Sequence, residues 1–314
     1  MAIAILNSPA EWIARFGEAR KPTAMTIGNF DGVHVGHQKI LRGVIERARS
    51  SGAMSAVLTF YPHPARVLRP EVAPGLLETL PQRLAEFDAL GIAAALVLKF
   101  DKDLAQASAE EFARKYLVET LRTRAVFVGA NFRFGHKQAG DVKLLERLGR
   151  ENGFAVEIVE PVVVDGIVVS SSAIRQAVRE GRIEEARKML GRPFALAGEI
   201  RPGTGLGHKL VVPTLNLATE QETLPKNGVY ATEVAVGGKN YQAVTNVGVR
   251  PTFDGQKLAI ESHLFGFADV LTSGAMTVTF LTRLRDERKF SGAEALRAQI
   301  LMDIKQAKEL FAKQ

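Results

Sequence analysis

The sequence contains no cysteine among its 314 residues. Disulfide bonds and thiol catalysis are therefore excluded, and a cysteine-free chain fits a cytoplasmic protein. The sequence also has no apolar run of membrane-spanning length, because its longest candidates, such as residues 92–98, are no longer than a strand. The N-terminus lacks a basic leader followed by a long apolar core, so we expect no secretory signal.

Long runs of like charge are missing as well, although the formal net charge is +7. A positive balance favours an anionic partner, either nucleic acid or nucleotides. Acidic residues are interleaved with the basic ones, and no basic stripe rich in aromatics occurs, so small phosphorylated substrates are the preferred interpretation. A composition of 46% hydrophobic and 24% charged residues fits a soluble globular protein, long enough for two domains.

A strand, a glycine-bearing turn and a helix follow one another near the start of the chain. Residues 24–27 form an apolar run, residues 28–32 hold two glycines, and helical periodicity begins at about residue 36. This order brings free backbone N–H groups and the positive end of a helix to one point, which suits a phosphate. His34 and His37 face the same point. A zinc site is conceivable, but there is no third ligand nearby.

Strands and helices continue to alternate up to about residue 160. The expected strands are 56–60, 94–99, 125–129 and 155–159, and the expected helices are 81–90, 108–121 and 141–152. Such alternation predicts a doubly wound, Rossmann-like parallel sheet with helices on both faces.

Two loops follow strands of this predicted sheet and carry groups suited to a planar ligand. Prolines on both sides of His63 fix an extended loop, and residues 129–135 place Asn131, two phenylalanines and an arginine between two glycines. Open α/β sheets bind ligands at the carboxyl ends of their strands. Aromatic and polar groups there could hold a flat ring, although purely structural loops are the alternative for both.

A serine run opens the last predicted helix of this half. Ser171 and Ser172 would cap the helix, and Arg175 follows one turn later. Hydroxyls, free N–H groups and a guanidinium together would bind phosphate oxygens. A second short helix ends at residues 191–193, where we place the boundary between a domain of residues 1–190 and one of residues 191–314.

The sequence pattern changes in the second half, where short β-rich runs alternate with glycine-rich turns. The runs at 195–200, 229–236, 241–247, 260–264 and 277–284 predict a small antiparallel barrel or sandwich, and a long amphipathic helix begins at residue 292.

A glycine-rich segment at residues 203–209 matches neither the P-loop nor the GxGxxG pattern. Thr214 and Asn216 follow it at a spacing that puts both on one face of an extended strand. Their oxygens could share Mg²⁺ with nucleotide phosphates. Glu261 stands alone between apolar residues, and it could accept a hydroxyl proton during phosphoryl transfer if it points into this site.

Together these motifs resemble one family, the bacterial bifunctional riboflavin kinase/FAD synthetases. His-x-Gly-His by itself resembles the signature of nucleotidyltransferases. The resemblance covers almost the whole chain, in the family's order, through GNFDGVHVGHQ (28–38), TFYPHP (59–64), GANFRFG (129–135), SSSAIR (170–175), PTLN (213–216), NGVYAT (227–232), NVGVRPTF (246–253) and ESHLF (261–265).

The resemblance implies two activities and their residues. The C-terminal barrel would phosphorylate riboflavin to FMN with ATP, and the N-terminal domain would adenylylate FMN to FAD with release of pyrophosphate. In the N-terminal domain, the residues that match the family's ATP-binding motifs are Gly28, Asn29, Phe30, Asp31, His34, His37, Ser171, Ser172 and Arg175. Flavin-side positions are Pro62, His63, Pro64 and Asn131.

In the kinase domain, the resemblance assigns ATP to Gly205, Gly207, Lys209, Thr214 and Asn216, with Mg²⁺ on the last two. Glu261 would be the general base, and His34, His37 and Arg175 would act in catalysis in the other domain. The chain departs from the family at Ser172, where threonine is usual, and at His208 and Val211, where arginine and glycine are usual.

Two other functions are compatible with parts of this pattern. One is an adenylyltransferase whose barrel only binds flavin. The other is a nucleic-acid-binding protein with an oligonucleotide-binding barrel, which the missing basic–aromatic clusters disfavour. We expect riboflavin, FMN, FAD and ATP as partners, and neither nucleic acid nor membrane. Self-association is possible but is not indicated by the sequence.

Overall fold

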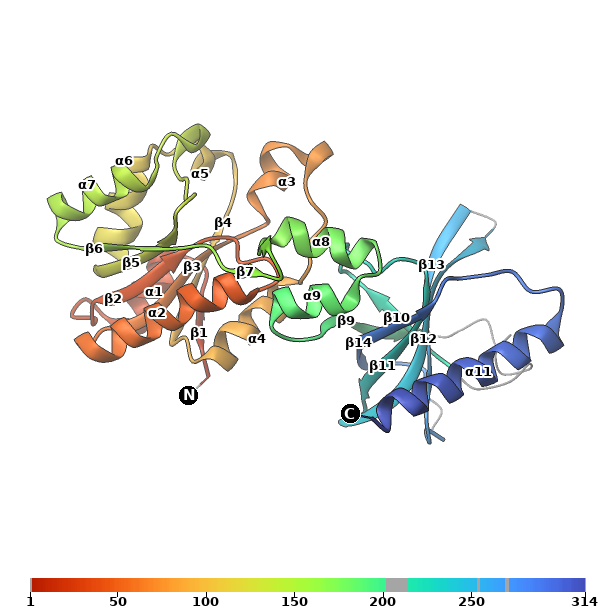
Figure 1. Ribbon diagram of the computed structural model, residues 1–314. Coiled ribbons are helices and arrows are strands. Elements are labelled where there is room, and N and C mark those ends of the chain that lie inside the picture. Colours follow the sequence, from red (N-terminus) through yellow and green to blue (C-terminus); the bar gives the residue numbers. More distant parts are fainter. Residues whose placement is uncertain (1, 202–213, 253–254, 269–270, 314) are drawn as a thin grey trace. The chain divides into compact units, whose positions relative to one another are not determined.

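A computed structural model of the protein describes residues 2–201, 214–252, 255–268 and 271–313. The chain forms two compact units, Met1–Ser170 and Ser171–Gln314 (Figure 1). Each unit is described by itself below. Within the described residues, no helix combines the length and the apolar character needed to cross a membrane.

The first unit is built on a six-stranded parallel sheet with the strand order β1-β4-β3-β2-β5-β6. The strands are β1 (Ala4–Leu6), β2 (Thr23–Ile27), β3 (Met54–Tyr61), β4 (Ala94–Lys99), β5 (Thr123–Gly129) and β6 (Ala155–Val159). All neighbouring pairs are parallel. The predicted parallel sheet is therefore confirmed.

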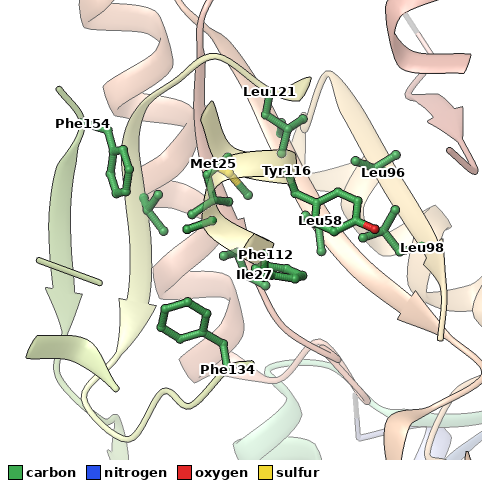
Figure 2. Packing of buried hydrophobic residues seen from close by; sticks show 14 of the residues in the cluster. Met25, Ile27, Leu58, Leu96, Leu98, Phe112, Tyr116, Leu121, Phe134 and Phe154 are labelled. Atoms are coloured by element: carbon green, nitrogen blue, oxygen red, sulfur yellow. The ribbon is translucent and has the colours of Figure 1, made fainter. Parts of the chain in front are cut away.

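Helices cover both faces of this sheet because alternate strand residues are apolar on both sides. Met25 and Ile27 pack with Trp12 and Phe112 on one face, as Figure 2 shows for part of the cluster. Ala24, the neighbour of Met25 in β2, packs on the other face. The helices are α1 (Pro9–Phe16), α2 (Val35–Ser51), α3 (Pro64–Leu68), α4 (Leu80–Leu90), α5 (Lys102–Gln106), α6 (Ala109–Phe112) and α7 (Val142–Asn152).

Sequence periodicity did not identify β1, because a strand of three residues is shorter than any periodic window. It did not identify the eight-residue helix α1 either. The helix expected at 108–121 begins with the predicted capping box at Ser108, but it changes to π-helix at Ala113–Thr120. The buried side chain of Arg20 donates from Nε to the Thr120 carbonyl at 2.8 Å, which satisfies a carbonyl at the end of this helix. Such a long-range cap leaves no local sequence signal.

The second unit combines a helix pair, a closed barrel and a terminal helix. The helices are α8 (Ser171–Arg179), α9 (Ile183–Leu190) and α11 (Ala293–Phe311). The strands are β9 (Phe194–Arg201), β10 (Leu215–Thr219), β11 (Gly228–Val236), β12 (Lys239–Thr252), β13 (Gly255–Leu264) and β14 (Ala275–Arg285). They close in the order β10-β13-β12-β11-β14-β9, with every neighbouring pair antiparallel. The predicted antiparallel barrel with a terminal helix is confirmed.

A buried ion pair attaches α11 to the barrel. Arg285, at the end of β14, donates from Nε and Nη2 to the two carboxylate oxygens of Asp303 at 2.9 and 2.7 Å. Gln299 donates to the same carboxylate at 2.6 Å, and Asp303 is only 2% exposed. The buried residues of α11 are Gln299, Asp303 and Ala307, so two of the three are polar, and apolar periodicity identified only Ala307 among them.

We expect Asp303→Ala to destabilise the second unit by about 1–3 kcal/mol, because it removes the hydrogen bonds from the partly buried Arg285 guanidinium to a buried carboxylate. Scanning calorimetry should show a lower transition temperature for this unit. Glu309→Ala, which removes an exposed acid from the same helix, is the matched control. Equal shifts for the two variants would contradict a docking role for the ion pair.

Candidate active site

The turn between β2 and α2 carries the His-x-Gly-His segment and has an unusual backbone. Phe30 adopts a φ of 52°, and the Gly28 N–H donates to the Leu58 carbonyl at 3.1 Å, which attaches the turn to β3. His34 caps α2 by accepting the His37 N–H on Nδ1 at 3.2 Å. An accepting Nδ1 puts the ring proton of His34 on Nε2, which can donate to a ligand.

The two imidazoles of this segment form a stacked pair. The ring centroids of His34 and His37 are 3.5 Å apart, with 16° between the ring planes. Phe30 meets the His37 ring edge-on at 5.1 Å. A Cβ added at Gly36 would lie 3.2 Å from the His34 ring, so the residue between the two histidines must be small. Both rings are thus fixed relative to the start of α2.

His37 is held in its neutral form. Burial lowers its pKa well below the ordinary 6.5, and the nearby imidazole of His34 and the cation of Arg83 lower the pKa further. The Nδ1 atom of His37 is enclosed and has no hydrogen-bond partner among the residues that the structure describes. Near pH 7 the stacked pair is therefore uncharged at His37, which avoids repulsion between two imidazolium rings.

This depressed pKa predicts a pH dependence. The unfolded ring titrates near 6.5 and the folded ring lower, so stability of the first unit should be complete above 6.5 and fall as the pH drops below that value. NMR titration of the ring should show the His37 resonance unchanged between pH 8 and pH 6.5. His37→Asn assigns the resonance by removing it. A titration midpoint at or above 6.5 would contradict the burial argument.

Asp31 lies two residues after Asn29 and is only 2% exposed. Its carboxylate accepts the backbone N–H of Leu77 at 3.0 Å and that of Glu78 at 3.2 Å. These bonds attach the turn to the loop that precedes α4. Asp31 therefore has a structural role, and its predicted contact with ATP stays a prediction.

A cavity of about 1140 Å³ opens at the carboxyl ends of β2, β3 and β5 within the first unit. Gly28 and Asn29, expected on the ATP side, line it together with His63, Pro64 and Asn131, expected on the flavin side. The fold thus brings three segments that are distant in the sequence, at residues 28–29, 63–64 and 131, to the walls of one cavity. Pro62 is not among the lining residues, and it follows Tyr61 through a cis peptide bond.

The walls of the cavity combine aromatic and basic groups. Phe132 and Phe134 stack with centroids 5.5 Å apart and 17° between their planes. Further lining residues that sequence reasoning did not identify are basic, and they come from separate loops and short helices: Arg69, Lys102, His136 and Lys137. These residues lie after different strands of the sheet, so their convergence on one cavity becomes visible only when the strand order is known.

The serine–arginine segment forms the first turns of α8, in the second unit. Ser171 is half-buried, Ser172 is exposed, and Arg175 is only 8% exposed. That these residues bind the same ATP phosphates as the histidine pair stays a prediction.

The barrel register brings together two of the residues expected in a kinase site. Asn216 on β10 lies directly opposite Glu261 on β13, and Asn246 on β12 lies opposite the same glutamate. Directly opposed side chains have Cβ atoms about 4.5–5.5 Å apart on one face of the sheet. Thr214, two residues before Asn216, is half-buried. Asn246 was not identified as a site residue from the sequence.

A ladder of buried hydroxyls lies on the opposite, interior face of the same strands. The Oγ1 atoms of Thr232 and Thr245 are 2.7 Å apart, and Thr245 Oγ1 is 2.8 Å from Ser262 Oγ. All three side chains are fully buried. Hydrogen bonds in such surroundings fix the register of β11, β12 and β13, and hence the position of Glu261.

Several residues of the predicted kinase site lie outside the described residues. They are Gly205, Gly207 and Lys209, together with the two departures at His208 and Val211.

A doubly wound sheet with stacked histidines at a helix start defines a nucleotidyltransferase type of domain, and a six-stranded barrel follows it. Residues 17–173 match the family model of FAD synthetase, and residues 190–311 match that of riboflavin kinase. The chain belongs to the bifunctional riboflavin kinase/FMN adenylyltransferase family.

Relatives of known name cover nearly the whole chain. It is 39% identical to the bifunctional riboflavin kinase/FMN adenylyltransferase of Pseudomonas fluorescens, across 91% of this chain and 92% of that protein. The protein of the same name from Escherichia coli K12 is 35% identical with the same coverage. The crystal structure of a macrolide-efflux protein from Streptococcus pneumoniae has a TM-score of 0.85 at 25% identity, over 98% of this chain and 99% of that one.

Proposed function

We propose that the chain catalyses both reactions of its family, the phosphorylation of riboflavin to FMN and the adenylylation of FMN to FAD. The observation that carries this proposal is the presence of two groups of site residues, one in each unit. The first group consists of the stacked histidine pair and of the residues that line the cavity in the same unit, although the two histidines are not among the lining residues. The second is the row of Asn216, Glu261 and Asn246 on the barrel.

For adenylylation, the isoalloxazine ring of FMN would occupy the cavity among Phe132 and Phe134, with Asn131 at its edge. Stacked aromatic walls and a nearby amide support this assignment. Basic groups at Arg69 and Lys102 suit the phosphate of FMN. Riboflavin lacks that phosphate, so the cavity favours FMN as the acceptor.

The adenylyl transfer itself needs no protein nucleophile. An FMN phosphate oxygen attacks the α-phosphorus of ATP, the bond from that phosphorus to the β-phosphate oxygen breaks, and pyrophosphate leaves. His34 would donate from Nε2 to the phosphate oxygens, and His37 would hold its neighbour on the stacked face. Hydrogen-bond donors that are fixed before the reaction stabilise the developing charge. Ser171, Ser172 and Arg175 at the start of α8 would also bind phosphate oxygens, because hydroxyls, free N–H groups and a guanidinium are suited to them.

For phosphorylation, the 5′-hydroxyl oxygen of riboflavin attacks the γ-phosphorus of ATP and ADP leaves. Glu261 would accept the hydroxyl proton. Thr214 and Asn216 would hold Mg²⁺, which neutralises phosphate charge when bound. Oxygen donors of this kind suit Mg²⁺, which usually takes few protein ligands together with phosphates and water.

We place the functional boundary between residues 190 and 191, so that α8 and α9 serve the adenylyltransferase. The match to riboflavin kinase, which begins at residue 190, supports this choice, whereas the compact units divide after Ser170. ATP and free flavins are cytoplasmic metabolites, so we propose that the protein works in the cytoplasm, without nucleic acid or membrane partners.

The decisive experiment is to incubate the protein with riboflavin, ATP and Mg²⁺ and to separate the flavins by chromatography. We expect both FMN and FAD. A protein that forms FAD from added FMN, but no FMN from riboflavin, would be an adenylyltransferase with a flavin-binding barrel. Absence of any flavin product would refute the proposal and reopen a nucleic-acid-binding role.

A further inference from the structure

Arg83 is a buried cation beside the histidine pair that the reactions above do not use. It lies in α4 and is only 1% exposed, as buried as the apolar residues Leu84 and Phe87 of the same helix. Arginine is almost never fully buried unless its charge is paired. A buried guanidinium next to a phosphate-binding turn therefore calls for a specific role.

The contacts of Arg83 lead to the turn that carries the site. Its guanidinium donates from Nη1 to the carbonyl oxygen of Asn29. The carboxylates of Asp31 and Glu78 balance its charge, and Asp31 in turn holds the loop before α4 through backbone N–H groups. The Nε atom is enclosed and makes no hydrogen bond within the described part of the chain. Arg83 thus connects α4 to the turn between β2 and α2.

A second contact from α4 reaches the adjacent turn residue. Phe87, one helical turn after Arg83, meets the ring of Phe30 edge-on at 5.5 Å, with 89° between the ring planes. Phe30 in turn lies edge-on against His37 at 5.1 Å. The helix therefore holds Asn29 and Phe30 at two neighbouring points, and Phe30 supports the ring of His37. A chain of direct contacts runs from α4 to the stacked imidazoles.

We propose that Arg83 is a positioning residue for adenylyl transfer. Its buried guanidinium fixes the Asn29–Phe30 turn against His37, so that His34 and His37 keep the stacked geometry that receives the phosphates of ATP. This inference rests on the adenylyltransferase activity proposed above. Displacement of reacting groups by about 1 Å can cost on the order of 100-fold in rate, so a residue without substrate contact can have a large effect.

The charge of Arg83 adds an effect that shape alone would not give. The charged or titratable groups around this part of the site are His34 at the start of α2, Asp31 in the turn, Glu78 before α4, Tyr61 at the end of β3 and Arg83 itself. Arg83 lowers the pKa of His37, whereas the two carboxylates balance Arg83. Without the cation, the pKa of His37 rises toward its ordinary value, and His37 becomes protonated at a higher pH.

The test compares full-length Arg83→Met and Arg83→Lys with the wild type. We expect Arg83→Met to lower kcat for FMN adenylylation by about 10- to 100-fold, with a smaller change in the KM for FMN. The acidic limb of its pH–rate profile should move to higher pH. Arg83→Lys keeps the positive charge but loses the planar guanidinium with its several N–H donors. Its kcat should therefore fall less than that of Arg83→Met, and the acidic limb of its pH–rate profile should stay at the wild-type position.

Two controls make the outcome specific. Arg49→Met removes an exposed arginine from α2 in the same unit and should leave both kcat and the pH profile unchanged. Riboflavin phosphorylation, measured on the same samples, should stay within about twofold, because positioning by Arg83 concerns only the other reaction.

The results separate the inference from the activity on which it rests. A wild-type protein that makes no FAD from FMN refutes the activity itself. The positioning role is refuted if the wild type is active and the folded Arg83→Met variant keeps the acidic limb of the wild-type pH–rate profile. This holds even if kcat of the variant falls. If Arg83→Met does not fold, the Arg83→Lys variant decides. A wild-type kcat in Arg83→Lys would show that the guanidinium group is not needed, and it would overturn the inference.

Discussion

His37→Ala is expected to reduce FMN adenylylation by about 10²–10³-fold, the usual loss when one fixed group of a charge-stabilising site is removed. The ring of His37 stacks on His34 at 3.5 Å, so its removal also frees His34 from its fixed orientation. The measurement is the rate of FAD formation from FMN and ATP, followed by chromatography at saturating substrate.

Riboflavin phosphorylation by His37→Ala should stay at the wild-type rate and serves as the internal control for the amount of protein and for the second unit. His37→Asn, which keeps a polar group but no imidazole, should be nearly as inactive in adenylylation. A loss smaller than about tenfold in both variants would assign the pair to structure rather than catalysis.

Glu261→Gln is expected to reduce riboflavin phosphorylation by about 10²–10⁴-fold, the range for loss of a general base. Glutamine keeps the size of the side chain and its place opposite Asn216 and Asn246, but it cannot accept the hydroxyl proton. FMN formation from riboflavin and ATP is the quantity to measure.

Conversion of FMN to FAD should survive in Glu261→Gln. Glu233→Gln, which changes an exposed glutamate on strand β11 of the same barrel, is the matched control and should keep both activities. Simultaneous loss of both activities in Glu261→Gln would count against two separate sites. Full phosphorylation activity would exclude Glu261 as the base.

Local sequence signals predicted those parts of the molecule that local interactions determine. The strand, turn and helix at residues 24–51 depend on apolar periodicity, on glycine and on a helix cap, all contained in one segment. The barrel strands likewise follow from their own periodicity and turns. The resemblance to the family added residue roles that periodicity alone could not provide.

Features that depend on pairing between distant segments were not predictable in the same way. The position of Asn246 opposite Glu261 depends on strand register, and a shift by one residue would turn either side chain to the barrel interior. Arg83 and Asp303 are charged residues at buried helix positions, where a periodicity argument expects apolar side chains. Their partners, Asn29 and Arg285, lie far away in the sequence, so only the fold reveals why a charge is tolerated there.

The six-stranded sheet and the barrel differ in how they end, and this difference limits how copies of the chain can join through backbone hydrogen bonds. The closed barrel pairs β9 with β10, so within the described part of the chain it offers no free edge strand. The open sheet ends in β1, with three residues, and in β6, with five. Very short edge strands are poor templates for strand addition. Aggregation by edge-to-edge pairing, for example after heating or during refolding, should therefore begin at β6.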